Sequence, residues 1–440
     1  MISSQYYPLL FCPTQSREEW YNTIMSKLIL ITNPGSASRK YALYDGEELM
    51  AQFHFEYEGK KVVCTIKDVD DGKKKIKPAI TDLNDAITIL PKILNDEEYV
   101  TDQHKLAAVV VRIVAPGDYF TEDHIVDAEY MKQLKEAEKR NPVHVPTTAN
   151  EIRGIRECFK GVKIISVSDS AFHWEKPDTY KYYSFDTELA DKYEIKRYGY
   201  HGLSYAYISR YMKEQGILPE KLVVMHLGSG SSVSAILNGK AMDNSMGYTP
   251  LEGLAMSTRV GTIDAAAALN LKKALKITSD EEFLLYLNKK CGLLGLSGIS
   301  DDMRDVIQAR DEGDLRASLA HSIFVYRIQS YVGQMAATLG GIDALVFAGT
   351  IGERSDEIRR FVTQKLGYLG FRLDENKNLA PEFTGRHALI STNDSKPIYI
   401  VFTDETAQMI YRAQSFLKGD KKSAVSEEEL KEDMKDDEED

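Results

Sequence analysis

The chain has 440 residues, 43% of them hydrophobic and 28% charged, and a net charge of −12 at pH 7. This length allows two or three domains, and the acidic balance argues against a general nucleic-acid or acidic-membrane partner. No apolar run approaches the roughly 20 residues of a membrane span. The four cysteines show no Cys-x-x-Cys spacing, so we expect free thiols in the cytoplasm.

Residues 1–24 are expected to be an N-terminal extension. Their apolar stretch YYPLLF is too short for a signal-peptide core and has no basic run before it. Met25 stands just before the first expected strand, so the chain has two candidate starts, Met1 and Met25.

The first structural motif begins at Leu28, where an apolar strand leads into the small-residue loop NPGSAS. An alternating strand and an Asp-Gly turn at Gly46 follow, as in a β-hairpin. Further on, DVDDGKKKIKP (68–78) is expected to be a solvated, charged loop. LAAVVVRIV (106–114) predicts a buried strand, in which Arg112 is an unusual charge unless it faces a site.

A second copy of the hairpin motif begins near Leu222 and ends in an Asn-Gly turn at Gly239. Without gaps, Gly35 aligns with Gly228 and Ser38 with Ser231. Glycine lets the backbone approach a ligand closely, and consecutive N–H groups suit an anion. No Gly-Lys-Ser/Thr closes either loop, which excludes a Walker loop. Turn geometry alone would explain one such loop, but two predict a duplicated architecture facing one phosphate-bearing ligand.

The rest of the chain alternates helix and strand signals. Residues 283–298 predict a helix followed by a Gly-rich turn, and 314–341 a long helix ended by two glycines. Residues 343–353 predict a buried strand that ends in a Gly-bearing loop. The whole is therefore α/β in two lobes, with a ligand beyond the strand ends. Residues 418–440 predict an acidic disordered tail or a frayed helix.

Five strings then occur in order: RYGYHGLS (197–204), HLGSGSS (226–232), SMGYTPLEGLAMSTRVGTID (245–264), GLLGLSGISDDMRDV (292–306) and GTIGERSDEIR (349–359). In these strings the chain resembles the acetokinase family, over about residues 27–415. The resemblance implies a two-lobed, duplicated ribonuclease-H-like (actin-like ATPase) fold with its active site in the interlobe cleft. Lobe I would comprise residues 25–172, completed by about 395–417, and lobe II residues 173–394.

The resemblance further implies reversible, Mg²⁺-dependent transfer of the ATP γ-phosphoryl group to acetate by direct in-line transfer, giving acetyl phosphate and ADP. Mn²⁺ is an alternative metal, and a homodimer is common in the family. Another nucleotide or pyrophosphate as donor, and propionate or butyrate as acceptor, remain alternatives. So does a non-catalytic nucleotide-binding module of the Hsp70/actin type. A sugar kinase would need an Asp general base, whereas a carboxylate acceptor is already ionised.

Bringing two anions together requires positioned positive charge, and forked guanidinium groups suit it. The resemblance assigns Arg112 and Arg259 to the carboxylate and the transferring phosphoryl group, although a surface ion pair would also explain either residue. It assigns Asp169 to supporting the metal or orienting an arginine, and His201 to donating a hydrogen bond to the phosphoryl group. A structural histidine is the alternative for His201.

The remaining site residues also come from the resemblance. The acceptor pocket would contain Arg112, Val114, Val143, Tyr200 and Pro250, although the two valines equally suit a core. Asn33 and Ser36 would line the phosphate end, and Asn33 and Glu405 would serve the metal. The nucleotide site would contain Lys40, His226, Gly228, Ser229, Gly230, Asp302, Met303, Arg304, Thr350, Ile351, Gly352, Glu353 and Arg354.

The donor side departs from the family pattern. Ser229 and Arg354 replace asparagines, and Thr350 replaces a glycine that lies against the adenosine in the family. A Cβ and hydroxyl at this position would narrow the nucleotide pocket.

Overall fold

The structure is a computed structural model that describes residues 28–35, 38–69, 72–101, 105–142 and 145–418. The expected extension at 1–24, the tail beyond Lys418, Ser36 and Val143 lie outside these ranges. Within them, no helix combines the length and the apolar composition needed to cross a bilayer.

The first lobe is built on an eight-stranded sheet with the order β5-β4-β3-β2-β1-β6-β8-β7. Its strands are β1 (Leu28–Pro34), β2 (Ser38–Asp45), β3 (Glu48–Glu58), β4 (Lys61–Asp68), β5 (Lys73–Ile76), β6 (Leu106–Ile113), β7 (His124–Ile125) and β8 (Lys163–Ser168). Its helices are η1 (Leu83–Asp85), α2 (Ala86–Asp96), η2 (Asp118–Thr121), α3 (Ala128–Arg140) and α4 (Val145–Cys158).

The second lobe is built on a six-stranded sheet with the order β11-β10-β9-β12-β14-β13. Its strands are β9 (Lys221–Leu227), β10 (Ser231–Leu237), β11 (Lys240–Asn244), β12 (Ala344–Ala348), β13 (His387–Leu389) and β14 (Ile398–Val401). Its longer helices are α6 (Thr187–Tyr193), α7 (Gly202–Glu214), α8 (Ala265–Ala274), α9 (Asp280–Lys289), α11 (Met303–Asp311), α12 (Leu315–Thr338) and α14 (Asp356–Thr363). Its shorter helices are α5 (Ala171–Trp174), η3 (Asp178–Tyr180), α10 (Gly292–Ser297), α13 (Gly349–Arg354), η4 (Gly367–Leu369) and α15 (Glu375–Leu379).

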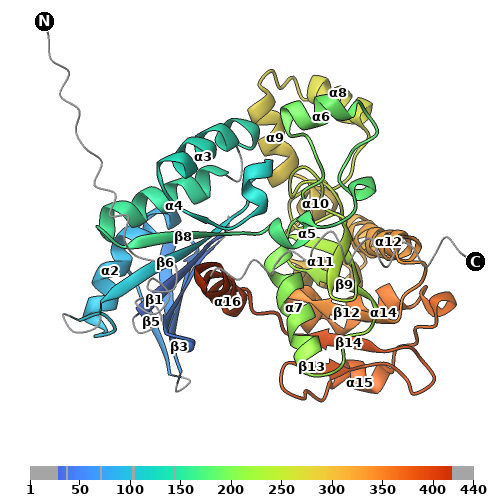
Figure 1. Ribbon diagram of the computed structural model, residues 1–440. Helices are drawn as coiled ribbons and strands as arrows, with labels where there is room; N and C mark the ends of the chain where they lie inside the picture. The colour runs from blue at the N-terminus through green and yellow to red at the C-terminus, as the bar shows by residue number, and fades with distance from the viewer. Residues whose placement is uncertain (1–27, 36–37, 70–71, 102–104, 143–144, 419–440) are drawn as a thin grey trace, which may run out of the picture.

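The two sheets share one topology, which confirms the duplicated fold. In each, three antiparallel strands (β1–β3 and β9–β11) come first. A fourth strand then pairs in parallel with the first of the three, and a fifth pairs in parallel with the fourth: β6 and β8 in one lobe, β12 and β14 in the other. The parallel strands are buried on both faces, so their sequences are nearly continuous apolar runs. Figure 1 shows the two sheets side by side.

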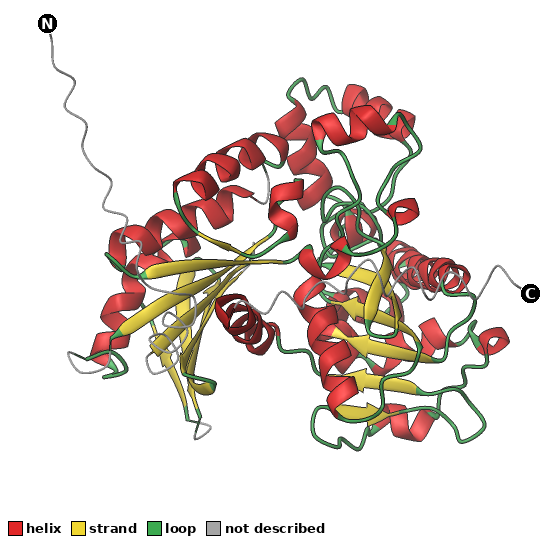
Figure 2. Ribbon diagram, in the orientation of Figure 1, coloured by secondary structure: helices red, strands yellow, loops and turns green. Residues whose placement is uncertain are grey.

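Each sheet lies between two layers of helices (Figure 2). Helices α2–α4 cover one face of the first sheet and form its main core. The last helix, α16 (Glu405–Lys418), covers the other face. In the second lobe α12 covers one face and α7 the other. Helices α7 and α16 pack against each other between the sheets (Figure 1).

The residue limits proposed for the two lobes can be compared with the positions of the last strand and the last helix. Strand β14 pairs with β12 in the second sheet, and only α16, from Glu405, packs on the first. A division that follows the sheets would therefore return to lobe I at Glu405, later than the expected position near 395.

Two local predictions were wrong. Lys73–Ile76, expected to be a solvated loop, forms the edge strand β5, paired antiparallel with β4. Its lysines are exposed, as suits an edge that must not pair with another chain. The expected Gly-rich turn after α9 is largely the short helix α10. The long helix predicted at 314–341 is confirmed as α12, capped by the Asp314 side chain, which accepts from the Ala317 N–H.

Candidate active site

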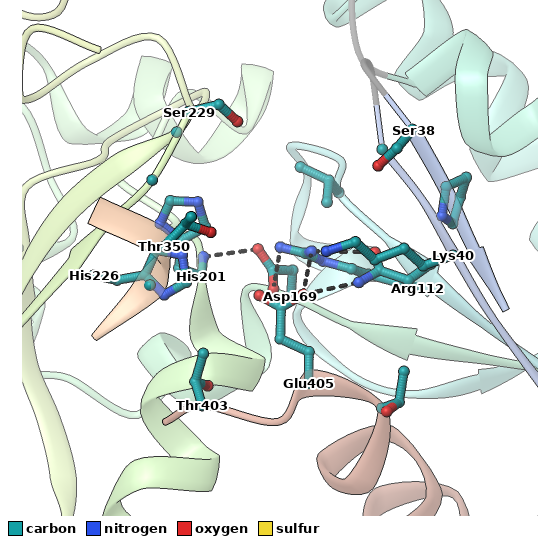
Figure 3. A pocket seen from close by; sticks show the side chains of 18 of the residues that line it. Ser38, Lys40, Arg112, Asp169, His201, His226, Ser229, Thr350, Thr403 and Glu405 are labelled. Atoms are coloured by element: carbon teal, nitrogen blue, oxygen red, sulfur yellow. Dashed lines mark hydrogen bonds and ion pairs between the residues drawn. The ribbon is translucent and has the colours of Figure 1, made fainter. Parts of the chain in front are cut away.

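A cavity of about 610 Å³ lies between the lobes, where the loops that follow β1, β6, β9 and β12 meet the start of α16. This is the strand edge at which the sequence predicts a ligand. The wall from the first lobe carries side chains of β1, β2, β3 and β6, and the opposite wall carries the glycine loop between β9 and β10. Figure 3 shows Lys40, Arg112 and Glu405 on one side of the cavity, facing His201, His226 and Thr350 on the other.

Arg112 is the centre of a buried ionic cluster. Its guanidinium lies 3.0 Å from Asp169 Oδ1 and 3.0 Å from Glu405 Oε2, and it donates to Asn33 Oδ1 at 3.2 Å. Asn33 in turn donates to Glu405 at 2.8 Å. Burial alone would lower the pKa of Arg112, but Asp169 and Glu405 outweigh it and raise that pKa. The end of β6, the loop after β8 and the start of α16 thus meet at one fixed cation.

Arg259 is held differently. It donates to the Pro250 carbonyl at 3.3 Å and approaches Met256 Sδ at 3.6 Å, and it has no ion pair with a carboxylate of the described residues. Burial, reinforced by the charge of Arg112, lowers the pKa of Arg259 to about 10. The group is still a cation at pH 7, so its environment lacks an anion that a ligand would supply.

His201 is positioned by an unusual backbone. Its φ is +59°, in the left-handed region, a conformation that costs free energy and occurs mainly at functional sites. Its N–H donates to Asp169 Oδ2 at 2.8 Å. The next residue must be glycine, because a Cβ on Gly202 would lie 2.1 Å from the Asp169 carbonyl oxygen.

The imidazole of His201 is neutral and points one nitrogen at the cavity. Nδ1 bonds Ser232 Oγ at 2.8 Å, and burial, with lesser contributions from His226 and Arg112, holds the pKa well below its usual value. The other nitrogen, Nε2, and the Arg259 guanidinium both lie beside Gly230. A Cβ on Gly230 would lie 3.2 Å from His201 Nε2 and 3.3 Å from Arg259 Nη1. The glycine keeps that space open for a ligand.

The donor side is formed by two glycine-bearing segments. In the β9–β10 loop, the Gly228 N–H donates to the Gly230 carbonyl at 3.1 Å. Facing it, Gly349 has φ +74°, and a Cβ there would lie 2.7 Å from the Leu227 carbonyl oxygen. Thr350 follows, exposed and lining the cavity. Glu353 accepts from the Gly349 N–H at 3.1 Å and from the Thr403 N–H at 3.2 Å, which ties the segment to the approach to α16.

Most of the predicted site residues line this one cavity. These are Asn33, Lys40, Arg112, Val114, Asp169, Tyr200, His201, His226, Gly228, Ser229, Gly230, Pro250, Arg259, Thr350, Glu353 and Glu405. The cavity wall does not include Asp302, Met303, Arg304, Ile351, Gly352 or Arg354. The Met303 side chain packs in the core of the second lobe, and Arg304 pairs with Asp302 at 2.5 Å, largely in solvent.

Several lining residues were missed by sequence reasoning. They are Gln52, Phe53, His54, Thr147, Thr148, Arg386, Thr403, Asp404 and Thr406. The alternation of β3 places His54 on one face with Gln52, but only the strand register shows that this face adjoins Lys40. Arg386 reaches the wall from the loop before β13 and pairs with Asp404 at 3.5 Å, a contact that no local pattern indicates.

Arg39, behind the first loop, was also missed. It is 4% exposed, at a strand position that faces the core. Its guanidinium donates to the Gly35 carbonyl, to the Ser38 carbonyl at 3.4 Å and to Asn84 Oδ1 at 2.7 Å. The buried carboxyl of Glu151, on α4, is an electrostatic neighbour of Arg39, and burial raises its pKa to about 7. The first loop is therefore supported by a charge inside the lobe.

The described residues contain no group of three His, Cys, Asp or Glu side chains placed to hold a metal ion by themselves. The cavity does offer oxygen atoms of Asn33, Asp169 and Glu405. Few protein oxygens beside an anion site suit Mg²⁺ bound mainly through phosphates and water.

Comparisons with known proteins agree with the fold and the motifs. A model described as the acetokinase family matches residues 28–412. The chain is 38% identical over 391 residues to an acetate kinase of Clostridium novyi (strain NT), covering 87% of this chain and 96% of the relative. It is also 38% identical over 386 residues to an acetate kinase of Thermoanaerobacterium thermosaccharolyticum, covering 86% and 96%.

Two solved structures are similar over most of their length. A propionate kinase from Francisella tularensis subsp. tularensis SCHU S4 has a TM-score of 0.78 at 32% identity, covering 88% of this chain and 98% of the other. Porphyromonas gingivalis acetate kinase has a TM-score of 0.74 at 31% identity, covering 89% and 99%.

Proposed function

The chain belongs to the acetokinase family, and from this premise we propose that it transfers the γ-phosphoryl group of ATP to acetate, giving acetyl phosphate and ADP. The observation that carries the proposal is the pair of partly buried arginines, Arg112 and Arg259, which approach one cavity from opposite lobes. The second of them has no carboxylate partner among the described residues.

The arginines suit the charge distribution of phosphoryl transfer, in which negative charge spreads over the equatorial oxygens while attacking and leaving oxygens stay in line. Arg112 is oriented by its two carboxylates, and Arg259 is poised for an anion. His201, neutral and with Nδ1 engaged by Ser232, can present an Nε2–H donor to the phosphoryl group. Preorganised donors of this kind lower the barrier without reorganising during the reaction.

Asp169 is already engaged, which argues against a sugar kinase. One oxygen faces Arg112 and the other accepts from the His201 N–H. A hydroxyl acceptor would need a free carboxylate as general base, but acetate is ionised at neutral pH. We propose that Asp169 positions the two catalytic groups beside it.

The acceptor end is small and partly apolar, which supports acetate. Val114, Tyr200 and Pro250 line it beside Arg112. The Tyr200 hydroxyl donates to the Tyr248 carbonyl at 2.7 Å. One methylene changes discrimination by only about 1–3 kcal/mol, so propionate stays a second candidate.

We further propose that Mg²⁺ serves the reaction, or Mn²⁺ in its place, held by the donor phosphates together with Asn33 and Glu405. The metal would neutralise phosphate charge when bound. Both residues are pre-oriented by the Arg112 cluster. Adding a chelator should therefore abolish turnover, and excess Mg²⁺ should restore it.

A homodimer and a cytoplasmic location are also part of the proposal. Helix α8 supports a partner surface, because none of its residues is buried and Leu269 is 61% exposed. Light scattering coupled to size-exclusion chromatography tests this, since a single-chain mass would contradict the dimer. The unpaired thiols of Cys64, Cys158 and Cys291 are consistent with a reducing compartment.

A matrix of donors against acceptors tests the function directly. ATP, GTP and pyrophosphate would each be combined with acetate, propionate and butyrate, with Arg259→Ala as the inactive control. We expect the highest kcat/KM for ATP with acetate. Turnover with pyrophosphate but not with ATP would contradict the proposed donor.

Thr350→Gly sharpens the donor assignment. The threonine adds a side chain where the family has glycine, so its removal should lower the KM for ATP with little change in kcat, as expected when uniform binding is restored. An unchanged KM would show that Thr350 does not narrow the nucleotide pocket.

A further inference from the structure

Polar side chains form a row across the first sheet at the edge that faces the cavity. Asn33 on β1 is in register with Lys40 on β2, and Lys40 with His54 on β3. On the other side, Thr32 pairs with Val111, so Asn33 lies level with Arg112 on β6. All four residues line the cavity. Because neighbouring strands are about 4.8 Å apart, the row from Arg112 to His54 extends over roughly 14 Å.

The two ends of the row differ in what their side chains contact. Arg112 and Asn33 are bound to each other and to Glu405. The other end contains Lys40, His54 and Gln52, which lies on the same face of β3 as His54. All three line the cavity, yet none has a side-chain hydrogen bond or ion pair with a residue that the structure describes. This end of the row is a set of free donors on one wall.

Carboxylates near this wall already have partners. Glu405 is bound by Arg112 and Asn33. Asp404 accepts from the Thr406 hydroxyl and the Ala407 N–H at 2.8 and 3.0 Å, and it pairs with Arg386. Glu56, the next residue after His54 on that face of β3, is an electrostatic neighbour of His54 but does not line the cavity. The free end of the row is therefore suited to an anion.

We propose that His54 and Gln52 join Lys40, which the resemblance already assigns to the nucleotide, in an anion subsite for the phosphates of the donor that are not transferred. This inference rests on the proposed function, because it places the transferred phosphoryl group at the Arg112 end of the row. An ammonium, an imidazole N–H and an amide are donors to phosphate oxygens. They recognise charge rather than a base, and they lie on the wall opposite Thr350. The subsite would thus accept a chain of phosphates with or without a nucleoside.

Tripolyphosphate is the probe that tests the subsite. Its binding to the full chain would be measured by calorimetry without acetate, for wild type, His54→Leu and Gln52→Ala. Loss of one donor to a charged group should weaken tripolyphosphate binding about 10-fold or more in His54→Leu. Orthophosphate is too short to extend along the row, so its affinity should change less than about twofold between wild type and His54→Leu. Thr65→Val is the matched control, because Thr65 continues the register on β4 but does not line the cavity.

The outcomes separate this inference from the proposed function. Unchanged tripolyphosphate affinity in both His54→Leu and a second variant, His54→Ala, would overturn the subsite while ATP and acetate still react. Equal weakening in Thr65→Val would overturn it too, since the cause would then be strand packing. Affinity that depends on His54, in a protein that phosphorylates none of the carboxylates, would support the subsite and refute the proposed function.

Discussion

The two lobes share a topology but hold their charged groups in different ways. In the first lobe, Arg112 is enclosed by the carboxylates of Asp169 and Glu405. In the second, the partners of Arg259 among the residues that the structure describes are a carbonyl and a thioether. The pKa of the first is raised and that of the second is lowered.

The two glycine loops repeat this contrast. The Gly35 loop is closed from behind by the buried guanidinium of Arg39, with Glu151 near it. The Gly228 loop is closed by a hydroxyl: Ser231 Oγ donates to the Gly228 carbonyl at 3.0 Å and accepts from its N–H at 3.3 Å. Duplication has thus preserved the loop but not the chemistry that supports it. In the first lobe the charge of Arg112 is neutralised by carboxylates before substrate binds. In the second lobe Arg259 has no carboxylate partner among the described residues.

Replacing each active-site arginine by alanine should give the largest effects. Either change should lower kcat by about 10²-fold or more, because each removes a contact that strengthens in the transition state. Stability should separate them. Arg112→Ala leaves the carboxylates of Asp169 and Glu405 without their cation and should cost about 3 kcal/mol or more. Arg259→Ala removes an uncompensated cation and should cost almost nothing. Urea denaturation and steady-state kinetics measure both.

Arg112→Lys and Arg259→Lys are the controls for charge alone. A point charge cannot fork between two oxygens, so neither should restore much activity. Equal destabilisation by the two alanine variants would show that the lobes do not differ in the way described.

Arg39→Met should have the next largest effect. It removes the buried donor to the Gly35 carbonyl and to Asn84 Oδ1 and the cation near Glu151, at an expected cost of about 1–3 kcal/mol. The KM for the donor should also rise, because Gly35 and Ser38 line the cavity. The double variant with Glu151→Gln should recover part of the stability. The exposed Arg153→Met on α4 is the matched control and should be neutral.

Glu151→Gln should change the pH dependence of stability. Burial raises the pKa of Glu151 to about 7, against the opposing effect of Arg39, so the folded chain holds a proton that the unfolded chain releases near pH 4.5. Folding is therefore favoured at low pH, and this contribution is lost as the pH rises toward 7 and beyond. Between pH 5 and 8, the wild type should lose about 2–3 kcal/mol more than Glu151→Gln. Parallel pH profiles would contradict this assignment.

Ser231→Ala should have the smallest effect. Loss of a buried hydroxyl that closes the second loop should cost about 1 kcal/mol, with no new pH dependence, because no titrating group is involved. Ser234→Ala, which removes a similar hydrogen bond to the Asp243 carbonyl farther along β10, is the control. It should cost a similar amount of stability, but only Ser231→Ala should raise the KM for ATP.

Sequence reasoning predicted the features that reside in short contiguous strings. The two hairpins, the strand that carries Arg112 and the capped helix α12 depend on local patterns, and the structure has all of them. The segment 292–297 was mistaken for a turn because glycine disfavours helices. Here Gly295 permits a close approach, since a Cβ on it would lie 2.7 Å from the Lys290 carbonyl oxygen.

The features that were missed depend on contacts between distant segments. Arg39 looks like an ordinary strand residue until α4 and η1 are packed above it. His54 becomes part of the cavity only through the register of β3 with β2. Strand β5 carries three lysines and no apolar alternation, so only its pairing with β4 reveals it.

Helix α16 has a consequence for how the chain is made. Met409, Ile410 and Ala413 complete the core on one face of the first sheet, together with Ile29, Ile31 and Val110 from the beginning of the chain. During synthesis that face remains uncovered until almost the whole chain has left the ribosome. The second lobe waits almost as long, because β14 completes its sheet only at Val401 and Ala407 of α16 packs against one of its cores. A nascent chain would therefore carry an exposed apolar sheet face for most of translation, a state that favours chaperone binding and, in truncated products, aggregation.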